Sequence, residues 1–139
     1  MKQFTHQLHI STNGKGLYDF TRDIDAWVRA HQPQTGLLTV FCQHTSASLL
    51  IQENADPDVV ADLTDFFAGL VPEDLHLYRH TAEGPDDMTS HIRAALTQTQ
   101  LSIPIRGGKL ALGTWQGVYL FEHRERPHRR TVVLHLLAD

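Results

Sequence analysis

The sequence has almost no cysteine: Cys42 is the only one among 139 residues. A single thiol cannot form a disulfide within the chain, so the disulfide-rich class of small secreted domains is excluded. No stretch approaches the roughly 20 apolar residues that a membrane-spanning helix needs, and residues 1–12 lack the apolar core of a signal peptide. We therefore expect a cytoplasmic protein that does not bind membranes.

Basic residues are not in excess either. The formal net charge is −4, which excludes the electrostatic footprint of a general nucleic-acid binder. Internal repeats, low-complexity tracts and linkers are absent, and 139 residues is an ordinary length for one domain. The sequence therefore predicts a single domain over residues 1–139.

Histidine and a local group of arginines stand out against this background. There are ten histidines, and histidine is both the commonest metal ligand and an acid or base near neutral pH. Four arginines fall within seven residues near the C-terminus: Arg124, Arg126, Arg129 and Arg130. A basic corner on an acidic chain favours a small anionic ligand over a polymer, although a solvated cluster on a hairpin explains the arginines equally well.

The pattern of apolar residues predicts an α+β fold. Alternation predicts strands over 3–11, 36–43, 48–53, 101–106, 109–113, 116–124 and 130–138. Helices are predicted from Thr21 to about residue 31, from Pro57 with Asp56 as its cap, and after Asp86. The last four strands have short connections, so we expect a largely antiparallel sheet with about three helices.

The stretch GPDDMTSHIR (84–93) begins the third helix. Its spacing predicts a buried stripe of Met88, Ile92 and Ala95, with Leu96 beside it. Asp87 and His91 are four residues apart and share a face beside that stripe, which holds a carboxylate and an imidazole together. An Asp in a first helical turn is also favoured by the helix dipole alone, so a purely structural role stays open.

Small hydroxyl residues follow His44 in the stretch QHTSAS (43–48). Thr45, Ser46 and Ser48 could donate hydrogen bonds to an anion through side chains and backbone N–H groups. No Gly-x-Ser-x-Gly motif accompanies Ser46, which argues against a serine hydrolase. Cys42 fits a buried core thiol better than a catalytic pair with His44.

Three histidines lie at or near predicted elements. His44 stands at a strand end, His80 in a loop and His91 in a helix. Three protein ligands with one open position are typical of catalytic zinc. No short spacing enforces this grouping, so surface roles remain an alternative.

Glu122 is predicted to lie in a strand buried on both faces. A buried carboxylate needs a partner, and Arg124, Arg130 or a metal-bound histidine could provide one. Upstream, the glycines of GTWQG (113–117) indicate a bend or a close approach of the backbone.

Four segments together resemble the YjbQ-like family, also called the secondary thiamine-phosphate synthase family. They are QHTSASLLIQENADPDV, EGPDDMTSHIR, IPIRGGKLALGTWQGVYLFEHR and the closing arginine pair. The resemblance covers residues 36–139, while the first 35 residues match only in general pattern. It implies a compact α+β domain, a homotrimer, and a polar cleft with a metal site near the subunit boundary.

The resemblance also assigns roles by position. It places metal ligands at His44, His80 and His91. The acidic and amide residues of the family's motifs correspond to Glu53, Asn54, Asp56, Asp86 and Asp87. The residues of its tryptophan motif correspond to Trp115, Gln116 and Glu122.

The family name implies a reaction that joins a pyrimidine-methyl diphosphate to a thiazole phosphate and releases pyrophosphate. Ordinary thiamine-phosphate synthases resemble (β/α)₈ barrels, which need about 200 residues or more, so this chain cannot share that scaffold. A secondary activity is the expectation.

We therefore expect a metal-binding enzyme that acts on a small phosphorylated metabolite. The metal would be zinc, or Mg²⁺ with a diphosphate substrate, and Asp87 or Glu122 would orient a ligand or act as base. The phosphorylated molecule would be bound by Thr45, Ser46, Ser48, Asn54, Gln116, Arg124 and Arg130. The alternatives are a trimer that binds a metabolite or metal without catalysis, and a purely structural trimer.

Overall fold

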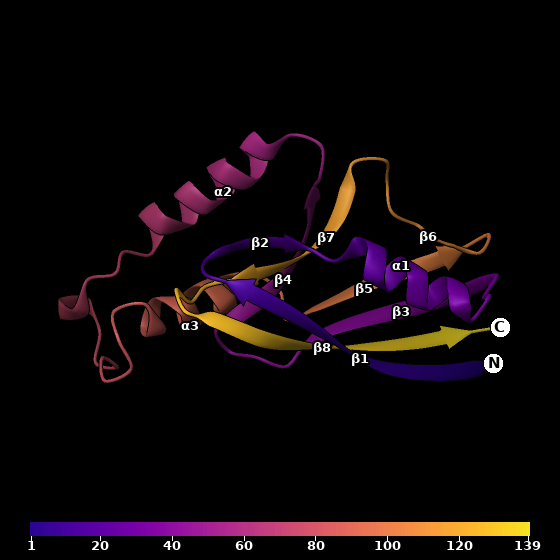
Figure 1. Cartoon of the computed structure of the whole chain (residues 1–139), viewed down its shortest axis with the longest axis horizontal. Coiled ribbons are helices and arrows are strands. Elements are labelled where there is room, and N and C mark those ends of the chain that lie inside the picture. The colour runs from indigo at the N-terminus through magenta and orange to yellow at the C-terminus, as the bar shows by residue number, and fades with distance from the viewer.

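Eight strands, three α-helices and one short 3₁₀ turn make up the chain in the computed structural model, which describes all of residues 1–139 (Figure 1). The strands are β1 Lys2–Asn13, β2 Gly16–Asp19, β3 Thr35–Cys42, β4 Ala47–Glu53, β5 Gln100–Arg106, β6 Lys109–Leu110, β7 Gln116–Glu122 and β8 Pro127–Ala138. The helices are α1 Thr21–Ala30, α2 Pro57–Leu70 and α3 Asp87–Leu96, and the 3₁₀ turn is Leu75–Leu77.

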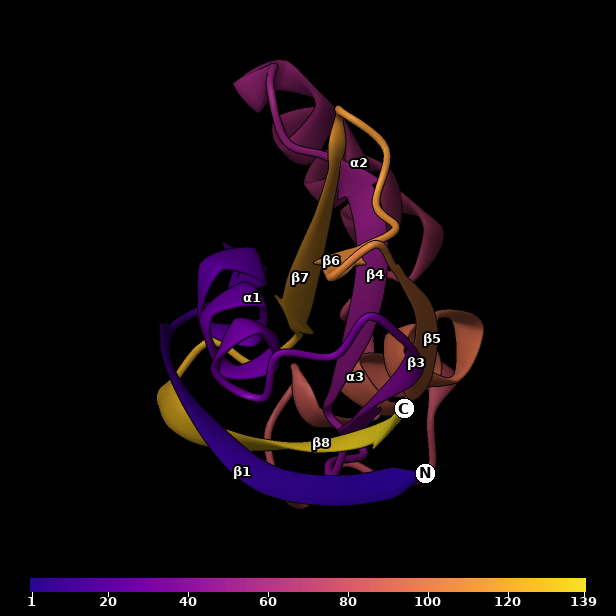
Figure 2. The same ribbon diagram turned by 90° about the vertical axis from the view of Figure 1, so that its right-hand side faces the viewer.

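The strands form two antiparallel sheets. The first has five strands in the order β1-β8-β3-β5-β6, and the second has three in the order β2-β7-β4. The longest pairing joins β1 to β8 along twelve residues, from Lys2 opposite Ala138 to Asn13 opposite Pro127, so the two ends of the chain lie together. The larger sheet curls, and α1 and β7 lie on its concave side (Figure 2). The predicted single α+β domain is confirmed.

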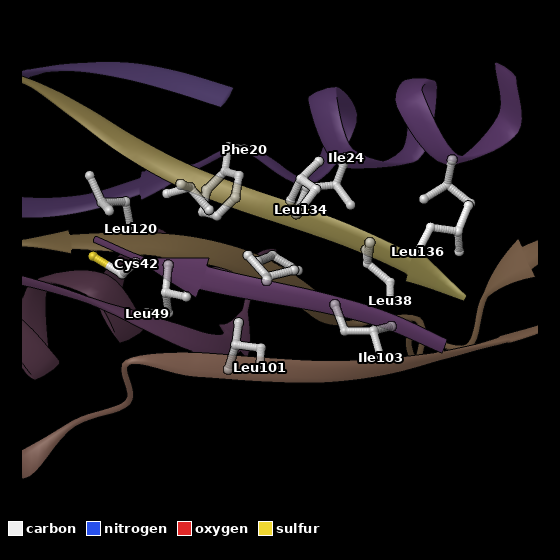
Figure 3. Packing of buried hydrophobic residues seen from close by; sticks show 14 of the residues in the cluster. Phe20, Ile24, Leu38, Cys42, Leu49, Leu101, Ile103, Leu120, Leu134 and Leu136 are labelled. Atoms are coloured by element: carbon white, nitrogen blue, oxygen red, sulfur yellow. The ribbon is translucent and has the colours of Figure 1, made fainter. Parts of the chain in front are cut away.

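The core fills the space between the curled sheet and the elements on its concave side. Leu38, Ile103 and Leu134 project from three neighbouring strands and are almost completely buried. Ile24 of α1 and Leu120 of β7 pack in the same cluster (Figure 3). This core anchors β7, whose last residues position the polar site described below.

Local signals account for most of these elements. The Asp56 side chain accepts from the backbone N–H of Asp58 at 2.9 Å, and Pro57 starts α2, as predicted. Cys42 is 1% exposed, which agrees with a core thiol, and burial raises the pKa of that thiol. Strand β2 was not predicted; it pairs with β7, with Gly16 opposite Glu122. None of the helices combines the length and the apolar character required to cross a bilayer.

The burial predicted for α3 is wrong, and α2 is not buried either. Helix α2 carries an apolar stripe of Val59, Leu63, Phe66 and Leu70, yet none of its residues is buried, and Phe66 and Leu70 are 61% and 52% exposed. Helix α2 projects from the body of the protein (Figure 1). In α3 the buried residues are polar, namely Asp87, Thr89, Ser90 and Arg93, while Leu96 is 58% exposed.

Contacts from distant segments explain this reversal in α3. The Ser90 hydroxyl donates to the carbonyl of His123 at 2.9 Å, and the Arg93 guanidinium donates to the carbonyl of Val71 at 2.8 Å. Buried polar groups need such partners, and here β7 and the end of α2 provide them. The polar face of α3 therefore faces inward and carries its acidic start toward the end of β7.

Candidate functional site

The start of α3 is fixed by an arginine from the loop after β7. Arg124 Nε donates to Asp86 Oδ2 at 3.0 Å, and its terminal nitrogen Nη1 pairs with Asp87 Oδ1. The backbone N–H of Glu125 also donates to Asp86 Oδ2 at 3.0 Å. Asp86 stands at the N-cap position as predicted, but its side chain caps no backbone N–H of the helix. Its carboxylate instead ties α3 to the loop after β7.

Asp87 is the centre of a cluster of metal-ligating side chains. Its Oδ2 atom lies 2.6 Å from His80 Nε2 and 3.2 Å from His91 Nε2. His80 Nε2 also lies 3.2 Å from Glu83 Oε2. One ligand atom from each of these four residues falls within 4.8 Å of all the others. We call these residues, His80, Glu83, Asp87 and His91, the α3 cluster.

The hydrogen bond on the other side of the His91 ring sets its tautomer. Nδ1 of His91 lies 2.9 Å from the carbonyl oxygen of Thr45. A carbonyl can only accept, so Nδ1 carries a proton and Nε2 of the neutral ring presents a lone pair. That lone pair faces the Asp87 carboxylate, which is also an acceptor. A cation between them, either a proton on Nε2 or a metal ion, relieves the repulsion.

Charge and burial both shape the α3 cluster. Burial raises the pKa of Asp87, but its contacts with His80 and Glu83 and the nearby positive charges outweigh burial, so the pKa lies below its usual value. The hydrogen bond to Asp87 raises the pKa of His80. Asp87 is 2% exposed, whereas the His80 side chain is 44% exposed. The cluster thus has an ionised, buried base and an opening to solvent.

The donor set of the α3 cluster fits a divalent cation. Two imidazole nitrogens and two carboxylates are ordinary zinc ligands, and imidazole is a poorer ligand for Mg²⁺. Thr45 orients His91 and Arg124 orients Asp87, as outer partners do in metal sites. Glu83 was not predicted as a ligand; its position three residues after His80 is the one sequence signal for it.

His44 lies outside the α3 cluster. Its Nε2 accepts from the backbone N–H of Thr131 at 2.8 Å, and its Nδ1 lies 3.4 Å from Arg130. Burial, followed by the charge of Arg130, lowers the pKa of His44. The Nε2 lone pair is thus occupied within the chain. The predicted three-histidine group is corrected to two histidines and two carboxylates.

Glu122 forms a second polar group, separate from the α3 cluster. Its Oε1 accepts from Thr12 at 2.6 Å and from Arg130 Nε at 2.7 Å, while its Oε2 pairs with Arg130 Nη2. Burial raises the pKa of Glu122, but the hydrogen bonds from Arg130 and Thr12 outweigh it and lower the pKa. Of the predicted partners, Arg130 is the one that neutralises Glu122, and Thr12 was not anticipated. With both oxygens occupied, Glu122 is not placed to act as base or to orient a ligand of the α3 cluster.

The predicted phosphate-binding residues are largely engaged elsewhere. Arg130 pairs with Glu122 and donates to the Ser46 carbonyl and hydroxyl at 3.2 and 3.1 Å. Arg124 is held by Asp86 and Asp87. Ser48 is 1% exposed, so it does not belong to an open loop. Within one chain both arginines thus have carboxylate partners and Ser48 is buried, so phosphate binding by these residues stays a prediction. Thr45 is exposed beside the α3 cluster.

Asn54 and Gln116 lie at the opposite end of β7 and β4. Glu53 is paired with Gln116 at one end of the two strands, and Ala47 with Glu122 at the other. Six strand steps of about 3.3 Å separate these ends by about 20 Å. A Cβ on Gly117 would meet Asn54 Cβ at 3.0 Å, which explains the predicted close approach. Asp56 and Trp115, the latter 62% exposed, also belong to this far end.

A groove of about 530 Å³ adjoins the α3 cluster. Its lining includes Glu83, which belongs to the cluster, and Arg124, which orients Asp87. Arg126 also lines the groove and is exposed, so it adds a positive charge. The arrangement can hold a cation with an anionic ligand beside it.

Comparison with known proteins identifies the family. A family model described as UPF0047 protein YjbQ-like matches residues 6–139. A UPF0047 protein of Synechocystis sp. is 58% identical over 99% of this chain and 94% of its own length. The UPF0047 protein YjbQ of Salmonella typhimurium is 39% identical over 98% of this chain and 99% of its own length.

Solved structures agree with these matches. A conserved hypothetical protein from Thermus thermophilus has a TM-score of 0.84 and 35% identity, covering 95% of this chain and 99% of its own. A protein of the yjbq/upf0047 family from Clostridium acetobutylicum has a TM-score of 0.83 and 34% identity, covering 96% of this chain and 99% of its own. The chain therefore belongs to the UPF0047 YjbQ-like family.

Proposed function

We propose that the α3 cluster binds a divalent metal ion, with zinc favoured by its two imidazoles. The observation that carries this proposal is the fixed tautomer of His91, whose Nε2 lone pair lies 3.2 Å from the ionised Asp87 oxygen. Because Asp87 Oδ1 is held by Arg124, Oδ2 is the oxygen left for a cation. His80 Nε2 contacts the same oxygen, so the ligand atoms converge on one point.

We propose further that the metal site acts on a small phosphorylated metabolite in the adjoining groove. A bound divalent ion supplies positive charge that neutralises a phosphate or diphosphate oxygen. Arg126 adds an exposed charge to the groove, and Thr45 is exposed near His91. Arg124 does not add to this charge, because Asp86 and Asp87 neutralise it.

The secondary thiamine-phosphate synthase reaction is the specific reaction that we propose to test first. In it a C–N bond forms between the thiazole nitrogen and the pyrimidine methylene, the C–O bond breaks, and pyrophosphate leaves. The main requirement is stabilisation of the leaving diphosphate, which a cation and positive side chains provide. A weak, metal-dependent rate is expected, since within one chain Arg126 is the free arginine of the groove.

Protein purified without a histidine tag tests both parts of the proposal. We expect zinc to bind with one equivalent per chain, and pyrophosphate to be released from the diphosphate and thiazole phosphate only in the metal-loaded form. The Asp87→Asn variant should lose both properties. Metal binding without turnover would support the proposed metal site and refute the proposed reaction.

A binding protein without catalysis is the second candidate. The observation that favours it is the neutralisation of two arginines by carboxylates: Arg124 by Asp86 and Asp87, and Arg130 by Glu122. Saturable binding of phosphate esters with no turnover across a broad panel would support this candidate.

We also propose a homotrimer, in which a second copy of the chain covers the exposed apolar stripe of α2. Phe66 and Leu70 are 61% and 52% exposed, and Leu96 of α3 is 58% exposed. Phe66 and Leu70 are four residues apart and share one face of α2, and an exposed apolar face of this kind is typical of interfaces. Assembly of copies is also the way in which the distant residues Asn54 and Gln116 could approach the α3 cluster of a neighbouring copy.

A further inference from the structure

The convex face of the larger sheet carries apolar side chains that nothing in the chain covers. Side chains alternate along a strand, and Leu38, Val40 and Cys42 of β3 are buried in the core. Leu37 and Phe41 therefore point outward, and they are 39% and 43% exposed. The solvated face of an antiparallel sheet is ordinarily polar, so these two side chains indicate that the face has a partner.

The strands on both sides of β3 enlarge this apolar area. Leu37 is paired with Leu137 of β8 and with Pro104 of β5, and Phe41 is paired with Val133 of β8. Paired residues lie on the same face of a sheet, about 4.5–5.5 Å apart. They form two apolar rows separated by one polar row, and a recess of about 520 Å³ includes Leu37 and Leu137 in its lining. We call these five residues the convex patch.

The charges on these strands are positive. Strands β1, β3, β5 and β8 contain no aspartate or glutamate. Arg106 and Arg129 are exposed and alternate with buried neighbours, so they lie on the convex face, and the ion pairs of the chain involve other arginines. Asp139 follows β8, but its carboxylate accepts from two backbone N–H groups at the start of β3. A complementary partner is therefore apolar and acidic.

Helix α2 has the properties of such a partner. Asp58, Asp62, Phe66 and Leu70 are each four residues from the next, so they follow one ridge of the helix, and all four are exposed. Residues 53–78 contain seven acidic residues and no lysine or arginine, so no basic side chain of this segment offsets the charge. The ridge is acidic in its first half and apolar in its second.

The spacing along the helix agrees with the spacing along the sheet. Asp58 lies eight residues before Phe66, which is about 12 Å along a helix. Arg129 lies four residues before Val133, which is about 13 Å along β8. With Phe66 against Val133, Asp58 reaches Arg129, and the end of the helix extends over the rest of the convex patch.

The helix does not cover the convex patch of its own chain. Helix α2 projects from the body on the side away from β1 and β8, whose outer surfaces belong to the convex face (Figure 2). A contact between the helix and the patch therefore joins two different surfaces on two copies. A head-to-tail contact of this kind closes into a ring when the rotation between copies allows it.

We propose that the convex patch is the docking surface for α2 of another copy of this chain. The inference rests on the proposed assembly of copies and names the surface that the exposed face of α2 meets. Apolar contacts of Phe66 and Leu70 hold the joint, while the opposite charges orient it, because single exposed ion pairs contribute little. Each copy offers one helix and one patch, so a closed ring leaves neither uncovered.

Substitutions in the convex patch test this inference by sedimentation velocity of the full chain. Phe41→Glu places a negative charge where the acidic α2 would dock, and it should convert the assembly to monomers at micromolar concentration. Ala26→Glu adds the same charge at an exposed position of α1 and should leave the assembly unchanged. Leu37→Glu is a second patch variant with the same expected result, and circular dichroism checks that each variant is folded.

A mixture of two variants tests the head-to-tail arrangement. Phe41→Glu keeps its α2 and Phe66→Asp keeps its convex patch, so one copy of each can form a single joint. An equimolar mixture of these monomers should give dimers that contain one copy of each variant. A mixture of Phe41→Glu with Leu37→Glu has no intact patch and should stay monomeric.

The possible results separate this inference from the proposals on which it rests. If both patch variants assemble like the original chain, the inference is overturned, and the proposed assembly stands with another surface over α2. An equimolar mixture of Phe41→Glu and Phe66→Asp that stays monomeric at millimolar concentration also overturns it. A monomeric original chain would refute the assembly and the inference together, without affecting the metal site.

Discussion

His91 Nε2 and Asp87 Oδ2 face each other at 3.2 Å as two acceptors, because the Thr45 carbonyl fixes the proton of His91 on Nδ1. The same Asp87 oxygen lies 2.6 Å from His80. Residues from the loop before α3 and from its first two turns thus converge on one carboxylate oxygen. This relationship underlies the proposed metal site.

The rank order of ligand substitutions follows from these contacts. Asp87→Asn should lower zinc affinity by more than about 100-fold, since even outer partners of a metal are worth about 10- to 100-fold. Glu83→Gln should cost less, about tenfold, because the Glu83 side chain is 65% exposed and lies at the edge of the cluster. Competition titrations against a zinc chelator measure both values. Equal losses in the two variants would show that Asp87 is not the central ligand.

The Glu122–Arg130 pair should contribute strongly to stability. Glu122 is fully buried, so Glu122→Gln leaves the charge of Arg130 unpaired and should lower the free energy of unfolding at pH 7 by about 3–5 kcal/mol. The double variant Glu122→Leu with Arg130→Met removes both charges and should recover most of that loss. Urea unfolding measures both. A double variant as unstable as the single one would mean that packing, not charge, is the cause.

The same residue predicts an acid effect. The pKa of Glu122 is lowered on folding, so its contribution to stability is present above its ordinary value of 4.5 and is lost as the pH falls through the folded value. The stability difference between the original chain and Glu122→Gln should therefore shrink as the pH falls below 4.5. Unfolding curves at pH 7, 5 and 3.5 test this; a constant difference would contradict it.

His123 should make stability depend on pH over a higher range. Its pKa falls from 6.5 to about 3 on folding, so the unfolded chain binds more protons between these values and stability rises with pH across that window. At about 1.36 kcal/mol per pH unit, the contribution approaches about 5 kcal/mol. In His123→Gln the free energy of unfolding should rise less steeply between pH 4 and 6. The slope should decrease by up to about 1.36 kcal/mol per pH unit, which corresponds to one proton. An unchanged slope would place the titration elsewhere.

The exposed stripe of α2 predicts the effect of a single charge on assembly. Phe66→Asp should convert a trimer to monomers in sedimentation velocity at micromolar concentration, because Phe66 is 61% exposed in one chain. Asp65→Asn, at a neighbouring exposed position, is the control and should leave the trimer intact. A monomeric original chain would refute the proposed assembly.

Much of the fold could be predicted from local signals, and the site only in part. Alternation located the long strands, and the Asp56-Pro57 pair located the start of α2. Strand β2 escaped notice because four residues after a glycine turn are too short to show a period. The burial of α3 was reversed because its polar face is satisfied by Val71 and His123, whose approach no local pattern reveals.

Distance along the sequence also decides which site residues were grouped correctly. Asp87 and His91 share one helix face, and His80 precedes it by a short loop, so sequence proximity brings all three together. His44 is distant in sequence, and its neighbours are decided by the pairing of β3 with β8, which places Thr131 N–H against its ring.

Metal stoichiometry in three proteins tests the central claim most directly. The tag-free chain, His91→Ala and His44→Gln would each be loaded with zinc, passed over a desalting column and analysed for metal per chain. We expect one equivalent in the original chain and in His44→Gln, and a loss in His91→Ala, because His91 belongs to the α3 cluster and His44 does not. Equal metal content in the original chain and His91→Ala, or loss in His44→Gln alone, would contradict the account.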